Sequence, residues 1–293
     1  MTQPSFKTSQ SGDHAVLLLH GLSSSPLELR FIARFLGDEG FATHTPELPG
    51  YSAGTGHLSM EQWISAAVSE FDALAVRYRH VSICGLSMGA TLAAAVAHQR
   101  PDARALLLLS ITLDYDGWAI PWYHFLVDWC YYTPLRSRYK YREHEPYGLK
   151  NEALRSKIAR AMQKSGISEV GAASIAMPAL HEASRLASLV KRTTKEISSD
   201  CLIIHAIDDE TSSPHNAEFV GANIGASFLR TIWLDDSYHM ISSDNEREVV
   251  ARECALFLRE SAAASTCADN PTPVVSRALA RRLRQLASIA EKA

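Results

Sequence analysis

The residues that could do chemistry begin with Ser87, which lies within the pentapeptide Gly-Leu-Ser-Met-Gly at residues 85–89. An apolar run with β-strand character precedes it and an alanine-rich helical run follows, so we expect Ser87 on a tight strand-to-helix turn. Glycines at both flanks would let the strand and the helix approach the serine backbone closely. The first amides of the helix would face developing negative charge, with the Met88 N–H as the first candidate oxyanion donor. The pattern predicts a nucleophile for acyl transfer, whereas the alternative is a plain glycine-flanked turn.

A serine hydroxyl needs a base to take its proton, and the base needs a carboxylate to hold its tautomer. The chain has twelve histidines, so position must select among them. His205 falls inside an expected strand, and His215 follows Asp209 too soon for an intervening helix and strand. His239 lies just past the last expected strand and is the predicted base, although an ordinary loop histidine is the alternative.

The predicted acid is Asp209, which follows an expected buried strand at residues 201–207. We favour Asp209 over Asp208 because the residue further past the strand end is better placed to turn toward the histidine. Asp235 and Asp236 are the remaining alternatives, interpreted as loop carboxylates exposed to water. The order serine, acid, histidine is the one that an open parallel sheet of this kind requires.

A second oxyanion donor is expected from the loop after the first strand. His20-Gly21-Leu22 leaves that strand where a glycine allows the chain to double back, so the N–H of Leu22 could point to the same oxygen as Met88. Its alternative is a plain strand-to-helix turn.

The elements that must position these residues alternate along the chain. Short apolar runs predict buried strands, and helical patterns separate them. The expected strands are residues 15–20, 41–46, 81–85, 105–110, 201–207 and 228–234, and the expected helices are 27–40, 61–79, 87–100, 181–197, 214–224 and 245–261. We therefore predict an α/β fold: a mostly parallel sheet with helices on both faces.

The alternation stops between about residues 111 and 180, where we find no clear strand pattern. A structureless linker of that length is unusual in a compact domain, so we predict a helical cap insertion over the active edge of the sheet. Its aromatic cluster would bind an apolar part of the substrate, or would merely pack the cap onto the sheet. The candidate substrate-binding residues are Trp118, Trp122, Phe125 and Trp129.

Composition excludes several classes of function. A formal net charge of −3 gives no general attraction to nucleic acid, and five widely spaced cysteines indicate neither a disulfide framework nor a metal site. The start of the chain lacks the apolar core of a signal peptide, and no apolar run is long enough to span a membrane. We expect a cytoplasmic protein with a flexible N-terminus at residues 1–13 and a main domain at residues 14–261.

The C-terminal part has a different pattern. Residues 262–273 are rich in Ala, Ser, Thr and Pro and predict a linker. Residues 274–293 predict a helix with one apolar stripe and one arginine-rich face. Such a helix either docks on the domain or frays, or it binds an acidic partner or an anionic lipid surface.

Taken together, these motifs resemble the α/β-hydrolase superfamily, nearest to bacterial carboxylesterases and monoacylglycerol lipases. The matching segments are HGLSSSP at 20–26, PELPG at 46–50, GLSMG at 85–89, DDE at 208–210 and SYH at 237–239. In that family the acid occupies a short Asp-Glu turn before a proline, which here is Asp209 before Glu210 and Pro214. Ala90 departs from the family pattern, because the nearest relatives often carry a third glycine there.

The resemblance implies a cap over an acyl pocket, a serine esterase mechanism and no cofactor. We therefore expect a hydrolase of small-molecule carboxylic esters that forms an acyl-enzyme on Ser87. A thioesterase or small-amide hydrolase would use the same three residues, and a hydrolase-like binding protein with slow turnover is a further alternative.

Overall fold

The computed structural model describes residues 12–120, 131–133, 140–142, 144–165, 167–168, 171–172 and 174–266. Three of the four predicted substrate-binding residues, Trp122, Phe125 and Trp129, lie outside these ranges. The predicted C-terminal helix at 274–293 and most of the predicted flexible N-terminus also lie outside them.

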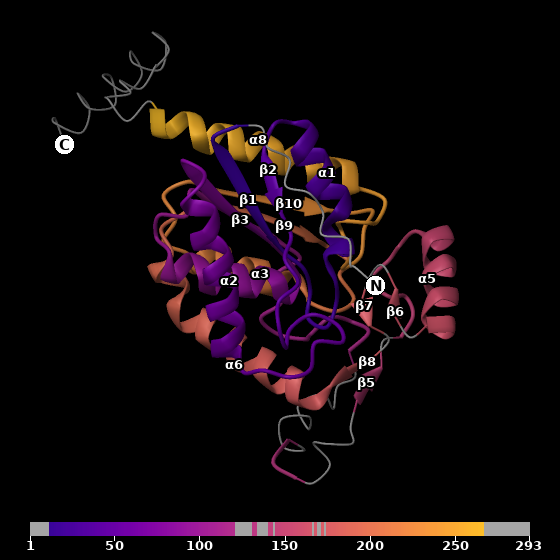
Figure 1. Cartoon of the computed structure of the whole chain (residues 1–293). Helices are drawn as coiled ribbons and strands as arrows, with labels where there is room; N and C mark the ends of the chain where they lie inside the picture. Colours follow the sequence, from indigo (N-terminus) through magenta and orange to yellow (C-terminus); the bar gives the residue numbers. More distant parts are fainter. Residues whose placement is uncertain are drawn as a thin grey trace, which may run out of the picture.

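A six-stranded, wholly parallel sheet forms the centre of the molecule, in the order β10-β9-β4-β3-β1-β2 (Figure 1). The inner strands are almost entirely apolar because helices cover both of their faces. Every strand expected from the sequence is present, with small shifts at the ends. The strands are β1 (His14–Leu19), β2 (Ala42–His44), β3 (His80–Leu86), β4 (Ala105–Leu109), β9 (Asp200–Ala206) and β10 (Leu229–Leu234).

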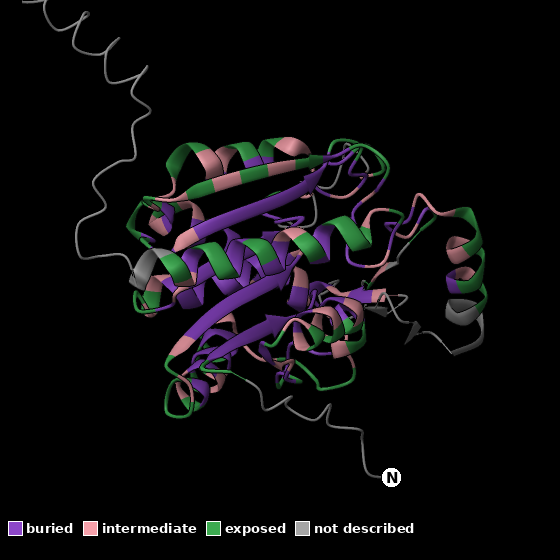
Figure 2. Ribbon diagram, turned by 90° about the horizontal axis from the view of Figure 1, so that it is seen from above, coloured by how far each residue is buried: buried purple, intermediate pink, exposed green. Residues whose placement is uncertain are grey.

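Helices pack on both faces of this sheet (Figures 1 and 2). The sheet therefore separates the core into two apolar clusters, one on each face. One face carries the short helix η1 (Pro26–Leu29), α1 (Arg30–Asp38) and α8 (Arg247–Thr266). The other carries α2 (Met60–Ala75), α3 (Met88–Gln99), α6 (Met177–Thr193) and α7 (Pro214–Asn223). This arrangement confirms the predicted α/β fold with helices on both faces.

The insertion lies between β4 and α6. It contains α5 (Glu152–Ser165), as a helical insertion requires, and also short strands: β5 (Lys140–Arg142), β6 (Ile167–Ser168), β7 (Gly171–Ala172) and β8 (Ser174–Ala176). β5 pairs antiparallel with β8, and β6 with β7. The expectation of no strand in this region was therefore wrong. Runs of two or three residues are too short for alternating hydrophobicity to reveal.

Two segments of the insertion, here called its stems, are joined to loops of the sheet. In the first stem (residues 117–119), the Gly117 N–H donates to the Thr211 carbonyl at 3.1 Å. In the second stem (residues 147–151), the Gly148 carbonyl accepts from the Met240 N–H at 2.8 Å. Thr211 lies in the loop after β9 and Met240 in the loop after β10. The stems therefore contact the two loops that carry the predicted acid and base.

The last described helix is longer than expected. α8 continues past Ser261 to Thr266, so the predicted linker at 262–273 is wrong for its first residues. Three alanines follow Ser261, and alanine has the highest intrinsic preference for the helix. None of the helices in the described ranges combines the length and the apolar character needed to cross a lipid bilayer.

Candidate active site

Ser87 lies at the turn between β3 and α3 in a strained backbone conformation, with φ 57° and ψ −125°. The turn is tight enough that only glycine fits on either side. A Cβ at Gly85 would lie 2.1 Å from the Gly89 carbonyl oxygen, and a Cβ at Gly89 would lie 2.2 Å from the carbonyl oxygen of Leu19 in β1. The Ser87 N–H donates to the Leu109 carbonyl at 2.9 Å, which fixes the turn to β4 as well. Three neighbouring strands thus hold the serine.

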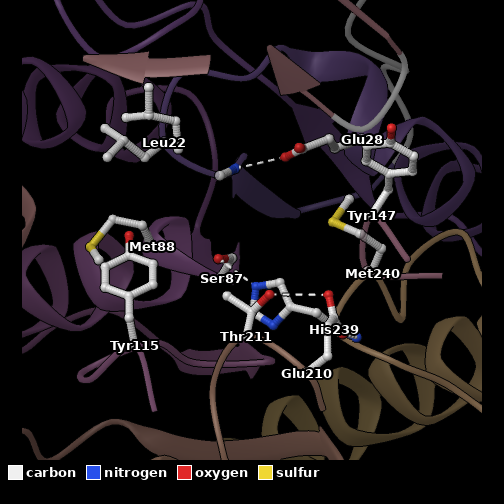
Figure 3. Close-up of a pocket in the computed structure, with 13 residues that line it drawn as sticks. Leu22, Glu28, Ser87, Met88, Tyr115, Tyr147, Glu210, Thr211, His239 and Met240 are labelled. Carbon is white, nitrogen blue, oxygen red and sulfur yellow. Dashed lines mark hydrogen bonds between the residues drawn. The ribbon is translucent and has the colours of Figure 1, made fainter. Parts of the chain in front are cut away.

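The structure brings together the three residues predicted to form a triad. His239 Nε2 lies 2.7 Å from Ser87 Oγ (Figure 3). His239 Nδ1 lies 2.7 Å from Asp209 Oδ2. Asp209 and His239 are buried, whereas Ser87 is partly exposed. With Nδ1 donating to the carboxylate, Nε2 carries no proton and can accept the one from serine. This arrangement can deprotonate a hydroxyl and stabilise the imidazolium that forms.

The acid loop fixes one carboxylate oxygen and leaves the other for the histidine. Asp209 Oδ1 accepts the N–H groups of Thr211 and Ser212 at 2.9 and 2.8 Å. His205 supports the same loop, because its Nε2 donates to the Ser212 carbonyl at 2.8 Å. Burial lowers the pKa of His205, which favours the neutral ring. His205 is thus a buried structural residue of the loop, as its place in the strand suggested.

The residues considered as alternatives for the acid and the base lie away from Ser87. Asp208 is exposed and faces Lys150 Nζ at 3.3 Å. Asp235 and Asp236 are also exposed, in the loop after β10, and His215 is exposed on α7. None of these side chains is placed against the serine.

The backbone of His239 is held from both sides. Its N–H donates to Glu210 Oε2 at 3.1 Å, and its carbonyl accepts from Ser110 Oγ at 2.7 Å. Burial raises the pKa of Glu210, which the positive charge of the neighbouring histidine partly offsets. The residue directly after the acid therefore positions the base.

Asp244 joins the histidine loop to the second stem of the insertion. Its buried carboxylate accepts the Tyr238 N–H at 2.9 Å and the Lys150 N–H at 2.7 Å on Oδ2, and the Asn151 N–H at 2.9 Å on Oδ1. Tyr238 immediately precedes His239. One carboxylate thus fixes two segments that are far apart in the sequence.

The two predicted oxyanion donors come from neighbouring strands. Leu22 follows β1 and Met88 opens α3 directly after β3, and β1 pairs with β3. The chain leaves these strands toward opposite faces of the sheet, where parallel sheets form a crevice at their carboxyl ends. In the part of the chain that the structure describes, neither N–H donates a hydrogen bond to another protein atom. Both groups are therefore available to an oxygen beside Ser87.

A cavity of about 80 Å³ lies beside Ser87 and His239 (Figure 3). Its wall is mixed in character, and part of it comes from the insertion. The apolar lining includes Leu22, Met88, Ile175 and Met240, and the polar lining includes Glu28, Tyr115, Tyr147, Glu210 and Thr211. Within the described residues, no group of three or more His, Cys, Asp or Glu side chains could hold a metal ion.

Trp118 lies over the acid and histidine loops. Its ring is 63% exposed, its Nε1 donates to the Asp208 carbonyl at 3.1 Å, and its edge contacts the Tyr238 ring at a centroid distance of 5.7 Å. It is not among the described residues that line the cavity. A role for Trp118 in substrate binding stays a prediction.

Sequence reasoning missed three acidic residues at this site: Glu28, Glu210 and Asp244. Each is buried, and each accepts a backbone N–H from a catalytic-loop segment. For two of them the sequence did offer a signal, which is their position next to a motif: Glu210 adjoins Asp209, and Glu28 lies shortly after the His20-Gly21 turn. Glu210 and Asp244 have N–H partners that are 29 and 94 residues away, and Glu28 accepts the N–H of Gly21 across a turn whose geometry no local pattern reveals.

Comparisons with known proteins agree with this geometry. The family described as Serine aminopeptidase, S33 (Hydrolase_4) matches residues 10–246. A carboxylesterase of Bacillus subtilis (strain 168) is 21% identical over 257 residues, which covers 86% of this chain and 95% of that protein. A thermostable monoacylglycerol lipase of Bacillus sp. (strain H-257) is 22% identical over 258 residues, covering 86% and 93%.

The fold is shared with solved structures of lipolytic enzymes. A chain from a study of LipS and LipT, two metagenome-derived lipolytic enzymes, superposes with a TM-score of 0.73 at 22% identity. The match covers 87% of this chain and 96% of that one. These relatives identify the architecture as that of an α/β-hydrolase.

The close approach at the serine turn predicts a large effect of Gly89→Ala. The added Cβ would overlap backbone atoms of β1 that cannot move aside, so we expect a loss of about 3 kcal/mol or more in the free energy of unfolding. Gly221→Ala, within α7, is the matched control, because the nearest atom to its added Cβ is Thr231 Oγ1 at 3.8 Å, an ordinary contact distance. Thermal melts that are the same for Gly89→Ala and the wild type would contradict the tight packing.

The carboxylate of Asp244 predicts a second effect. An asparagine would turn its NH₂ group toward at least one of the N–H donors, so Asp244→Asn should lower the free energy of unfolding by about 1–3 kcal/mol. Displacement of the histidine loop should also slow the reaction of Ser87 with a fluorophosphonate by about tenfold or more. Asp235→Asn, at an exposed carboxylate, is the control. Equal reaction rates for the two variants would show that Asp244 does not position His239.

Proposed function

The chain belongs to the family described as Serine aminopeptidase, S33, and we propose that within it the protein is a carboxylesterase that acts through an acyl-enzyme on Ser87. The observation that carries the proposal is the continuous pair of 2.7 Å hydrogen bonds from Ser87 through His239 to Asp209. The similarity to a carboxylesterase and a monoacylglycerol lipase supports esters as the substrate class.

The proposed reaction has two halves. His239 Nε2 takes the proton from Ser87 Oγ while the oxygen attacks the ester carbonyl carbon, and Asp209 stabilises the imidazolium. The N–H groups of Leu22 and Met88 bind the oxyanion of the tetrahedral intermediate. His239 then gives the proton to the leaving alcohol oxygen, and the carbon–oxygen bond breaks. In the second half, His239 deprotonates a water that attacks the acyl carbon. His239 then gives this proton to Ser87 Oγ as the bond between the acyl carbon and Oγ breaks, which releases the carboxylic acid and restores Ser87.

The cavity supports a short acyl group. A volume of about 80 Å³ has room for several water-sized groups rather than a long chain. We therefore propose that short-chain esters are preferred and that the insertion contributes to this selection through Tyr147 and Ile175, which line the cavity.

A second candidate is the hydrolysis of a small amide that carries a free amino group. The family description names aminopeptidases, and the buried carboxyl groups of Glu28 and Glu210 in the cavity wall could bind an ammonium group.

A partner surface at residues 274–293 and a cytoplasmic location stay predictions from the sequence alone.

Substitution of the triad tests the proposal directly. Ser87→Ala and His239→Ala should each reduce kcat on p-nitrophenyl butyrate by about 10⁴-fold or more, because no other group supplies the nucleophile or the base. Asp209→Asn should also cause a large loss, since the amide no longer fixes the histidine tautomer. Asp208→Asn, one residue away and exposed, is the matched control and should stay within about threefold of the wild type. Retained turnover in Ser87→Ala would overturn the proposal.

A substrate panel tests the substrate class. We expect kcat/KM to be highest for p-nitrophenyl esters of short acids and to fall by about tenfold or more toward long-chain esters. Matched thioesters and amides, including an amide with a free amino terminus, should react more slowly. A preference for the thioester or the amino-terminal amide would favour those alternatives, and a stoichiometric burst without turnover would favour the binding protein.

A further inference from the structure

Glu28 is a buried acidic residue in the cavity wall, and the proposed reaction gives it no role. It lies in η1, is 3% exposed, and lines the cavity beside Ser87 (Figure 3). Its Oε2 accepts the Gly21 N–H at 2.8 Å. Gly21 directly precedes Leu22, whose N–H is the proposed oxyanion donor. A carboxyl group in the cavity wall thus contacts the segment that carries half of the oxyanion hole.

The two peptide groups that meet at Gly21 are each held by a side chain. Glu28 accepts the Gly21 N–H, which belongs to the His20–Gly21 peptide. His20 Nδ1 donates to the Gly21 carbonyl oxygen at 2.7 Å, and that oxygen shares a peptide plane with the Leu22 N–H. Burial lowers the pKa of His20 to about 4, so the ring is neutral and its Nε2 can accept from Ser52 Oγ at 2.8 Å. The direction of the Leu22 N–H therefore depends on both side chains.

Glu28 itself is fixed to the histidine loop. Its backbone carbonyl accepts from Ser242 Oγ at 2.9 Å. A Cβ on Gly21 would lie only 3.1 Å from the Glu28 carboxylate, so the carboxylate and the loop are in close contact. The oxyanion segment, the carboxyl group and the segment after His239 therefore form one packed unit.

The charge on this carboxyl group is sensitive to pH near neutrality. Burial raises the pKa of Glu28 from 4.5 to about 7, while the nearby Ser24 hydroxyl, the hydrogen bond from the Gly21 N–H and the charge of His239 partly oppose the shift. The other titratable groups near it are Tyr51, which interacts with it electrostatically, and those that line the same cavity: Tyr115, Tyr147, Glu210 and His239. An ionised carboxylate is a stronger acceptor for the Gly21 N–H than a protonated one.

We propose that Glu28 is a positioning residue for the oxyanion hole: its ionised carboxylate holds the His20–Gly21 peptide and thereby keeps the adjoining Gly21–Leu22 peptide in the orientation that the reaction requires. The inference rests on the proposed esterase function. When Glu28 is protonated, the Gly21 N–H is bound less firmly and the Leu22 donor is less well aligned. Full activity therefore requires that both Glu28 and His239 be deprotonated.

The pH dependence of kcat/KM distinguishes this role from a structural one. On the acid side, log(kcat/KM) for p-nitrophenyl butyrate should rise with a slope approaching about 2 in the wild type, because two deprotonations are needed. Glu28→Gln keeps an acceptor for the Gly21 N–H but cannot titrate, so its slope should be about 1. Near about pH 8.5, where the wild-type carboxylate is ionised, its kcat should be about tenfold lower than that of the wild type, because a neutral amide binds the Gly21 N–H less firmly. Glu248→Gln, at an exposed position on α8, should retain the wild-type slope.

A transition-state analogue tests the alignment separately. Glu28→Leu removes the acceptor, so we expect kcat to fall by about 10- to 100-fold with little change in KM. The Ki of a butyl trifluoromethyl ketone, which forms an oxyanion on Ser87, should rise by the same factor. A slope of about 2 in Glu28→Gln, or an effect of Glu28→Leu on KM alone, would overturn the assignment. If Glu28→Leu does not fold, the slope in Glu28→Gln decides.

Thermal melts separate stability from catalysis. The folded-state pKa of Glu28 lies above its ordinary value, so the native state binds more protons than the unfolded state between pH 4.5 and about 7, and the contribution of Glu28 to stability is lost as the pH rises through this window. Glu28→Gln should therefore raise Tm relative to the wild type more at about pH 8.5 than at about pH 5. A more stable variant that has lost the steep pH dependence supports positioning. A wild type without ester hydrolysis at any pH would instead refute the proposed function itself.

Discussion

The direct backbone contact between α3 and the strands β1 and β3 is the constraint on which the rest of the site depends. It places Ser87 in a left-handed conformation that costs about 1–3 kcal/mol in a non-glycine residue. The surrounding core stabilises this arrangement, because α3 is buried from Met88 to Ala97 and lies against the centre of the sheet. The nucleophile is therefore set by rigid elements. The acid and the base come from loops, and these loops must be brought to the serine.

The insertion takes part in that task. Its first stem binds the acid loop at Thr211, and its second stem binds the histidine loop at Met240 and through Asp244. The same region also supplies Tyr147 and Ile175 to the cavity wall. A segment that the sequence indicates only as a cover over the site is thus also part of the support for the triad. A change in the stems would act on the orientation of His239 as well as on access to the cavity.

Much of the fold follows from local sequence, because buried parallel strands are continuous apolar runs and the residues after them meet at one edge of the sheet. That reasoning places Ser87, Asp209 and His239 correctly with respect to the strands. It fails for β5–β8, which are too short to show a period, and for the end of α8, where Ala262 and its neighbours continue the helix. The buried carboxyl groups were missed for a different reason. An acidic residue is expected in water, and only the N–H groups that the folded loops direct at it explain its burial.

Those carboxyl groups bear on the basicity of the catalytic histidine. Asp209 must be ionised to hold the imidazolium, but further full charges close to the ring would favour the protonated base and would lower the fraction of His239 able to accept a proton. Burial raises the pKa values of Glu210 and Glu28, so neither group carries its full charge under all conditions. Both still offer oxygen atoms to backbone N–H groups in either protonation state, although the protonated form is the weaker acceptor. Burial of these acids thus preserves their hydrogen bonds to the His239 and Gly21 backbones while it limits the negative charge around the base.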